Sequence, residues 1–150
     1  MTWLSEASGS GEPSRSRRPA RAELAAAALL FEAAHVDDRV DAQERAVIGG
    51  LLERRFGLDH DAARRLLAEA ERAADRSTQL FRFAQLINDQ FSGSQKIALM
   101  EMLWEVVYAD GSLDALEDTL LRRIGGLLYI PDHERGAARQ RVLERMGRKG

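Results

Sequence analysis

The stretch that decides the fold is LAAAALLFEAAHVDDRVDAQERAVIGGLLERRFGLDHD, residues 24–61. Its apolar residues recur every three or four positions on both sides of an acidic segment, which is the period of an amphipathic α-helix. A shift of 73 positions leads to a second copy, IALMEMLWEVVYADGSLDALEDTLLRRIGGLLYIPDHE, residues 97–134, and the two pair without a gap. We therefore predict an internal duplication, in which two helix–turn–helix–helix units pack as a pseudo-twofold bundle.

The two copies agree at positions that would pack in a helical core. Each copy also carries an Asp-His-acid triplet at the expected start of its third helix, Asp59-His60-Asp61 and Asp132-His133-Glu134. The apolar pairs are Phe31 with Trp104, Val47 with Leu120, Ile48 with Leu121, Leu51 with Ile124, and Phe56 with Tyr129.

Helical periodicity continues along the rest of the chain, and no stretch alternates as a strand would. We predict an all-α fold, a compact bundle of about seven helices with short connections. The helix between the two units carries Leu80, Phe83, Ile87 and Phe91 and is predicted as an insert. Local signals mark the helix ends: Pro19 before the first helix, Gly57 after the second at 42–56, Asp59 before the third, Ser92 with Gln95 before the fifth, Asp114 before the sixth, and Pro131 before the seventh.

Composition sets the domain boundaries. The 150 residues are 45% hydrophobic, which suits one globular domain. Residues 1–18 are rich in Ser, Gly, Arg and Pro and are predicted to be a disordered tail. The domain should span 19–146, and 147–150 should fray. Within the domain, the aromatic residues at helical spacing, Phe31, Trp104 and Tyr108, are predicted to lie in the core.

Several classes of function are unsupported by the sequence. A formal charge of −2 lacks the basic excess of a nucleic-acid-binding protein, and no cysteine is present for a disulfide, a zinc-thiolate site or a thiol nucleophile. No apolar run reaches the length of a membrane span, and no apolar signal core occurs near the N-terminus, so we expect a cytoplasmic protein. No catalytic nucleophile motif or phosphate-binding loop occurs, so we expect no enzyme activity.

Four isolated polar residues have structural explanations. His60 and His133 are predicted to be exposed residues in the first turns of their helices. His35 borders the first acidic segment, and it either joins that segment or is a packed or half-exposed helix terminus. Asn88 lies beside apolar neighbours and either bonds a buried backbone group or lies exposed at the end of its helix.

Each copy has one acidic segment between its first two helices. The segments are DDRVDAQE, residues 37–44, and DGSLDALE, residues 110–117. Both place acids at positions i, i+4 and i+7. The six candidate metal ligands are Asp37, Asp41, Glu44, Asp110, Asp114 and Glu117.

Two interpretations of these acids stay open. Helix capping alone explains the later two acids of each segment, because Asp41 and Asp114 occupy N-cap positions with a glutamate three residues on. Capping does not explain Asp37 and Asp110, which follow the carboxyl end of a helix, where a negative charge is unfavourable. A bound cation would relieve that cost.

The second segment also matches the latter half of a calcium-binding EF-hand loop. Asp110, Gly111, Asp114 and Glu117 take the relative places of its fifth, sixth, ninth and twelfth positions. The first half does not match, so a complete EF-hand loop is excluded. The alternative to capping alone is a weaker site for Ca²⁺ or Mg²⁺ built from oxygen ligands.

Three segments resemble the TerB family of tellurite-resistance proteins. They are AALLFEAAHVDDRVDAQERAVIGGLLERRFGL, LFRFAQLINDQFS and ALMEMLWEVVYADGSLDALEDTLLRRIGGLLYI, and the likeness covers about residues 22–143. The resemblance implies a compact helical bundle of a kind also found at the head of some membrane-anchored DnaJ co-chaperones. This sequence departs from the family pattern at Asp38, where glycine is commoner, and at His35.

The resemblance also implies a function. TerB-like domains are viewed as acidic, metal-associated stress-response modules that act through protein complexes at or near the membrane. We therefore expect a protein partner, with no nucleic acid and no direct membrane span, and divalent metal at the six acids named above. The alternative is a metal-free protein-interaction domain whose acidic segments only cap helices.

Overall fold

The computed structural model describes residues 20–34, 42–74, 80–109 and 115–147. These residues form seven α-helices and no strand, which confirms the all-α prediction. No helix in these ranges is long and apolar enough to cross a membrane. The helices are α2 (Arg21–Ala34), α3 (Ala42–Phe56), α4 (His60–Ala74), α5 (Leu80–Gln90), α6 (Gly93–Ala109), α7 (Ala115–Leu127) and α8 (Asp132–Arg145).

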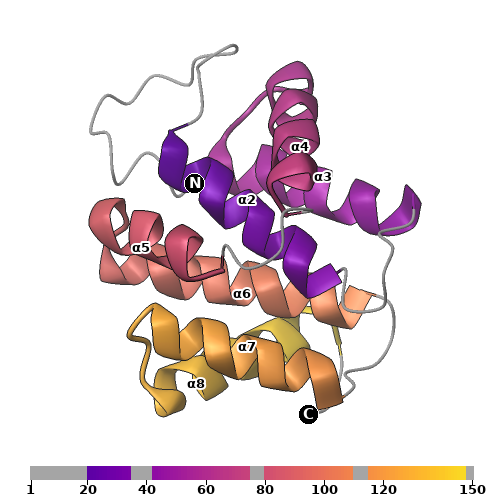
Figure 1. Cartoon of the computed structure of the whole chain (residues 1–150). Helices are drawn as coiled ribbons and strands as arrows, with labels where there is room; N and C mark the ends of the chain where they lie inside the picture. The colour runs from indigo at the N-terminus through magenta and orange to yellow at the C-terminus, as the bar shows by residue number, and fades with distance from the viewer. Residues whose placement is uncertain (1–19, 35–41, 75–79, 110–114, 148–150) are drawn as a thin grey trace.

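Helix α2 is the central element of the bundle. It contacts α3, α4, α5, α6 and α7, whereas α8 packs mainly on α6. In Figure 1, α3 and α4 lie at one end of the molecule, α7 and α8 lie at the other, and α5 and α6 run between them. In both predicted units the first helix packs against the third, α2 against α4 and α6 against α8. The internal duplication itself stays a prediction.

The composition of α2 explains its position. Of its 14 residues, 11 are buried, and most of these are alanines. Small side chains let the backbones of neighbouring helices approach closely from several directions. The buried acid of its first turn, Glu23, accepts a hydrogen bond from the backbone N–H of Ala20 at 2.8 Å. The helix begins at Arg21, and Pro19, predicted to precede it, lies outside the described residues.

Several local signals act as the sequence predicts. Gly57 takes a φ of 68° after α3, and Asp59 Oδ1 accepts the backbone N–H of Ala62 at 2.8 Å. Ser92 and Gln95 form a capping box before α6. The Gln95 side chain accepts the Ser92 N–H at 2.8 Å, and the Ser92 hydroxyl accepts the Gln95 N–H at 3.2 Å.

The core also follows the prediction. Phe31, Trp104 and Tyr108 are buried, and Trp104 stacks on Tyr108 with ring centroids 5.9 Å apart. Asn88 donates from Nδ2 to the backbone carbonyl of Leu127 at 2.9 Å, which confirms the first of its two explanations and ties α5 to the end of α7.

The corner between α7 and α8 differs from its predicted counterpart. The N–H groups of Tyr129 and Ile130 donate to the carbonyls of Gly126 and Gly125 at 3.1 and 2.9 Å, which closes α7 in a Schellman motif. Tyr129 takes the left-handed position with a φ of 59°, and it is 79% exposed. Phe56, its partner in the alignment of the two copies, is fully buried. The two residues therefore differ in burial, because the chain turns one residue earlier after α7 than after α3.

Candidate functional site

The predicted acidic ligands fall mostly in segments that the structure leaves undescribed. Asp37, Asp41, Asp110 and Asp114 lie outside the described residues. Glu117 is in the first part of α7, but its side chain is not described. Glu44 is described and lies half-buried in the first turn of α3. The convergence of the six carboxylates therefore stays a prediction.

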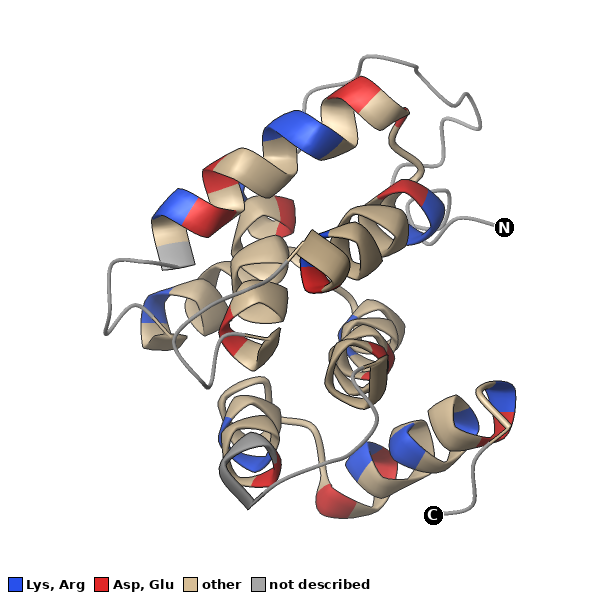
Figure 2. Ribbon diagram, turned by 90° about the vertical axis from the view of Figure 1, so that its right-hand side faces the viewer, with Lys and Arg blue, Asp and Glu red and all other residues tan. Residues whose placement is uncertain are grey.

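The helix ends that border the two segments are described. Helix α2 ends at Ala34 and α3 begins at Ala42, while α6 ends at Ala109 and α7 begins at Ala115. All four ends lie on the right-hand side of the molecule in Figure 1, and Figure 2 looks onto this side. Since α2 and α6 are also in contact, one side of the bundle carries both places where an acidic segment starts.

The electrostatics of these ends favour a cation. The last four carbonyls of an α-helix have no partner within the helix, and they form the negative end of its dipole. Helices commonly offset this charge with a basic residue in the last turn, as α3 does with Arg54 and Arg55. The last turns of α2 and α6 contain no basic residue. An acidic segment therefore follows each of these two helix ends, which already carry the negative partial charge of the helix dipole.

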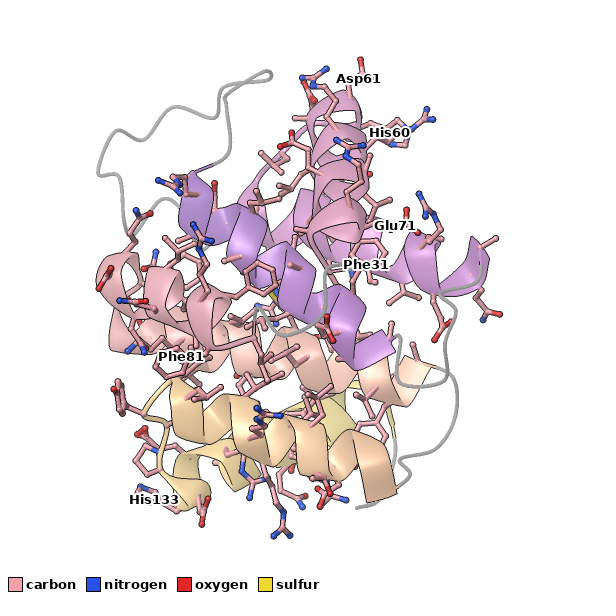
Figure 3. The ribbon with its side chains drawn as sticks, in the orientation of Figure 1. Phe31, His60, Asp61, Glu71, Phe81 and His133 are labelled. Atoms are coloured by element: carbon pink, nitrogen blue, oxygen red, sulfur yellow. The ribbon has the colours of Figure 1, made fainter. Side chains whose placement is uncertain are left out.

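The described histidines give no second candidate for a metal site. Within the described ranges, no group of three or more histidine and acidic side chains could hold a metal ion. His60 has a 69% exposed side chain that meets only Glu53, at 3.1 Å from Nδ1. His133 is also exposed, and Figure 3 places these two histidines at opposite ends of the molecule. The prediction that both are exposed first-turn residues is confirmed, and His35 lies outside the described residues.

A charged cluster that the sequence did not predict joins α3, α6 and α8. We call it the arginine clamp, and it consists of Arg55, Glu101, Glu105, Arg141 and Arg145. Arg141 Nε donates to Glu101 Oε2 at 2.8 Å, and Arg145 donates to Glu101 Oε1 at 2.8 Å and to Glu105 Oε1 at 2.5 Å. Arg55 from α3 lies 3.5 Å from both carboxylates.

The clamp changes the acidity of its central carboxylate. Burial by itself would raise the pKa of Glu101, whose side chain is 12% exposed. The hydrogen bonds and positive charges of Arg141 and Arg145 outweigh burial and hold the pKa below its ordinary value of 4.5. Glu101 is therefore ionised at neutral pH and binds α8 through charge-assisted hydrogen bonds.

A fourth arginine of the region covers the aromatic pair of α6. Arg139 Nε donates to the hydroxyl of Tyr108 at 2.7 Å, and its guanidinium lies 5.8 Å from the ring centroids of both Tyr108 and Trp104. The indole N–H of Trp104 is buried and has no hydrogen-bond acceptor in the described part of the chain. The contact between α6 and α8 therefore includes polar and cation–π interactions beside its apolar residues.

A signal for the clamp was present in the sequence. Glu101 and Glu105 are four residues apart, as are Arg141 and Arg145, so each pair shares one helix face. The spacing alone did not show that the two faces meet, because they lie about 40 residues apart in the chain.

Comparison with protein families identifies one relationship for this chain. Residues 23–140, most of the chain, match the family described as "Tellurite resistance protein TerB". Comparisons with curated proteins and with solved structures give no match.

Proposed function

Since the chain belongs to the TerB family of tellurite resistance proteins, we propose that it is a non-enzymatic accessory module of the stress response. We further propose that its two acidic segments bind a divalent cation, Ca²⁺ or Mg²⁺. Binding would fix the helix junctions on that side of the bundle and so present a defined surface to a protein partner in the cytoplasm or at a membrane-associated complex.

One observation carries the metal proposal. Two helix carboxyl ends without basic residues, those of α2 and α6, lie on the same side of the bundle as the amino ends of α3 and α7. Hard cations of this kind prefer carboxylate and backbone carbonyl oxygens. A helix carboxyl end that continues into an acidic segment offers both kinds of oxygen within a few residues.

The residues that would hold the ions are the six predicted acids. Asp37, Asp41 and Glu44 belong to the segment between α2 and α3. Asp110, Asp114 and Glu117 belong to the segment between α6 and α7. A cation would neutralise Asp37 and Asp110, whose charges add to the negative helix ends. The same ion would oppose the positive ends of α3 and α7, so its affinity should depend on several carboxylates acting together.

The test is whether an ion stabilises the protein through these residues. Thermal unfolding would be measured in EDTA and in millimolar Ca²⁺ or Mg²⁺ for the wild type and for Asp110→Asn and Asp114→Asn. We expect a higher melting temperature with ion in the wild type and little or no increase in either variant. Asn caps a helix as well as Asp does, so capping alone predicts that Asp114→Asn changes the melting temperature by the same small amount with and without ion.

Asp132→Asn is the matched control. Asp132 is also an aspartate in a first turn, that of α8, and its side chain is 95% exposed. Its replacement should leave the ion effect intact. If the wild type shows no ion-dependent shift, and no amide of residues 110–117 responds to millimolar ion in NMR spectra, the metal proposal is wrong. The metal-free interaction module then becomes the better description.

A further inference from the structure

Helix α8 is attached to the bundle in an unusual way. It packs mainly on α6, and only Ala138, Val142 and Leu143 among its 14 residues are buried. Helix α2, by comparison, buries nearly all of its length against five neighbours. The apolar contribution to the docking of α8 is therefore smaller than that of α2, because it grows with the apolar area removed from water.

Ion pairs and cation–π contacts add to the apolar contact along this helix. Arg141 and Arg145 bind Glu101 and Glu105, and Arg139 covers the aromatic pair described above. Figure 2 shows basic residues along α8 beside α6. Ion pairs between partly exposed residues weaken as salt rises, so a helix held in this way is easier to release than one held by a core.

The chain also stores strain where α8 begins. Tyr129, with its φ of 59°, takes a conformation that a side chain disfavours, and it stands three residues before Asp132. The residue before the helix, Pro131, provides no side-chain hydrogen bond as a cap. The corner thus has a strained residue on one side and a helix start without a side-chain cap on the other.

Removal of α8 would leave a surface of defined chemistry on α6. Of the residues that the structure describes, Arg55 would be the one cation left paired with Glu101 and Glu105, so two negative charges would face one positive charge. Trp104 and Tyr108 would lose the covering guanidinium of Arg139. Acidic and aromatic groups side by side on one helix fit a helix that carries arginines and a short apolar stripe.

From these observations we propose that the face of α6 beneath α8 is a docking site for a basic amphipathic helix of a partner protein. In the free protein, α8 occupies this face as an intramolecular competitor. The inference goes beyond the function proposed above and does not depend on whether the acidic segments bind metal.

The first test measures how α8 opens. Native-state hydrogen exchange followed by NMR should show the amides of α8 exchanging at least tenfold faster than those of α6, after correction for intrinsic rates. Arg141→Ala with Arg145→Ala should speed exchange in α8 and leave α6 unchanged, and salt at 0.5 M should act in the same direction on the wild type. If α8 and α6 of the wild type exchange with the same protection at both salt concentrations, α8 opens only with global unfolding and the proposal is wrong.

The second test adds α8 as a separate peptide, which competes with the α8 of the full-length protein. A fluorescent peptide of residues 131–147 would be titrated with the full-length wild type and with the Arg141→Ala, Arg145→Ala variant. We expect the variant to bind the peptide at least tenfold more tightly, because its own helix competes less well. Glu101→Gln with Glu105→Gln, added to that variant, should abolish the gain. Arg122→Ala is the control, because Arg122 pairs with Asp118 on the exposed face of α7.

Three results would overturn the proposal. One is peptide binding of equal affinity to wild type and variant, and another is binding that ignores the glutamate changes. The third is a concentration-dependent dimer of the wild type, measured by sedimentation, that the glutamate changes abolish. That dimer would assign the face to α8 of a second copy, not to a different protein.

Discussion

The corners that follow α3 and α7 both end one helix and begin the next, but they use different residues. After α3, Gly57 takes the left-handed position, the neighbouring Phe56 is buried, and Asp59 caps the next helix at 2.8 Å. After α7, a tyrosine takes the left-handed position and is exposed, and the next helix has no side-chain cap. The first corner relies on a glycine and a side-chain cap, whereas the second relies on the backbone hydrogen bonds of its Schellman motif.

The difference shows that similar sequence does not guarantee equivalent environment. A shift of one residue in the turn moves an aromatic side chain from the core to the surface. It also places a side chain where glycine is preferred, at a cost of about 1–2 kcal/mol. The corner with the strained tyrosine leads into α8, the helix that the arginine clamp holds on α6.

The largest expected effect comes from the two aromatic residues themselves. Phe56→Ala should lower the free energy of unfolding by about 3–5 kcal/mol, because it leaves a cavity in the core. Tyr129→Ala should change it by less than about 0.5 kcal/mol, because the side chain is mostly in water. Chemical denaturation of both variants measures the difference. Similar losses would mean that Tyr129 is buried in solution and that the two corners are alike after all.

The next largest effect concerns ion pairs between helices, one set between α6 and α8 and one pair between α3 and α4. Glu101→Gln should cost about 2 kcal/mol at pH 7, because it removes charge-assisted hydrogen bonds that hold α8 on α6. Glu71→Gln, which breaks the exposed pair with Arg45 between α3 and α4, should cost less than about 0.5 kcal/mol. Urea denaturation at pH 7 compares the two.

The pH dependence of Glu101→Gln gives a further check. The pKa of Glu101 is lower in the folded protein than its ordinary value of 4.5. Its stabilising contribution is therefore complete above pH 4.5 and is lost as the pH falls through the lowered value. The difference between wild type and Glu101→Gln should shrink over that range. A difference that stays constant down to pH 3 would contradict the clamp as described.

A smaller effect is expected at the glycine of the first corner. Gly57→Ala should destabilise the protein by about 1–2 kcal/mol, because alanine at a φ of 68° is strained. Gly93→Ala is the control, since a methyl group there meets no atom within 4 Å. Thermal unfolding measures both, and equal shifts would show that the backbone at Gly57 relaxes.

The smallest effect should be a gain. Tyr129→Gly relieves the strain at the second corner but makes the unfolded chain more flexible, so we expect stabilisation of only about 0.5 kcal/mol. The cation–π contact between Lys96 and the Tyr129 ring, at 5.8 Å, would be lost and reduces the gain. A clear loss of stability would show that this contact, not the backbone, decides the energy of the corner.

Much of the fold was predictable because its signals are local. Gly57, Asp59 and the Ser92–Gln95 box act within a few residues of their own helix end. The periodic apolar residues similarly predicted the helices and the aromatic core. Short-range interactions of this kind depend little on how distant parts of the chain are arranged.

The parts that sequence could not predict depend on distant residues. The arginine clamp needs α3, α6 and α8 to meet, and no spacing within one helix states that they do. Tyr129 takes a left-handed position where glycine is generally preferred, so its own residue type gives no sign of the turn. For the candidate metal site, the sequence identified the six acidic residues, and the structure shows the helix ends that border their segments.

The alanine-rich helix at the centre of the bundle has a consequence for synthesis. α2 precedes every other described helix in the chain, yet its covering includes α6 and α7, which end at Ala109 and Leu127. A ribosome adds about 5–20 residues per second, so this apolar segment stays without its neighbouring helices for several seconds after its synthesis. During that interval the nascent chain exposes an apolar segment, and slower translation of the second half would prolong its exposure to aggregation.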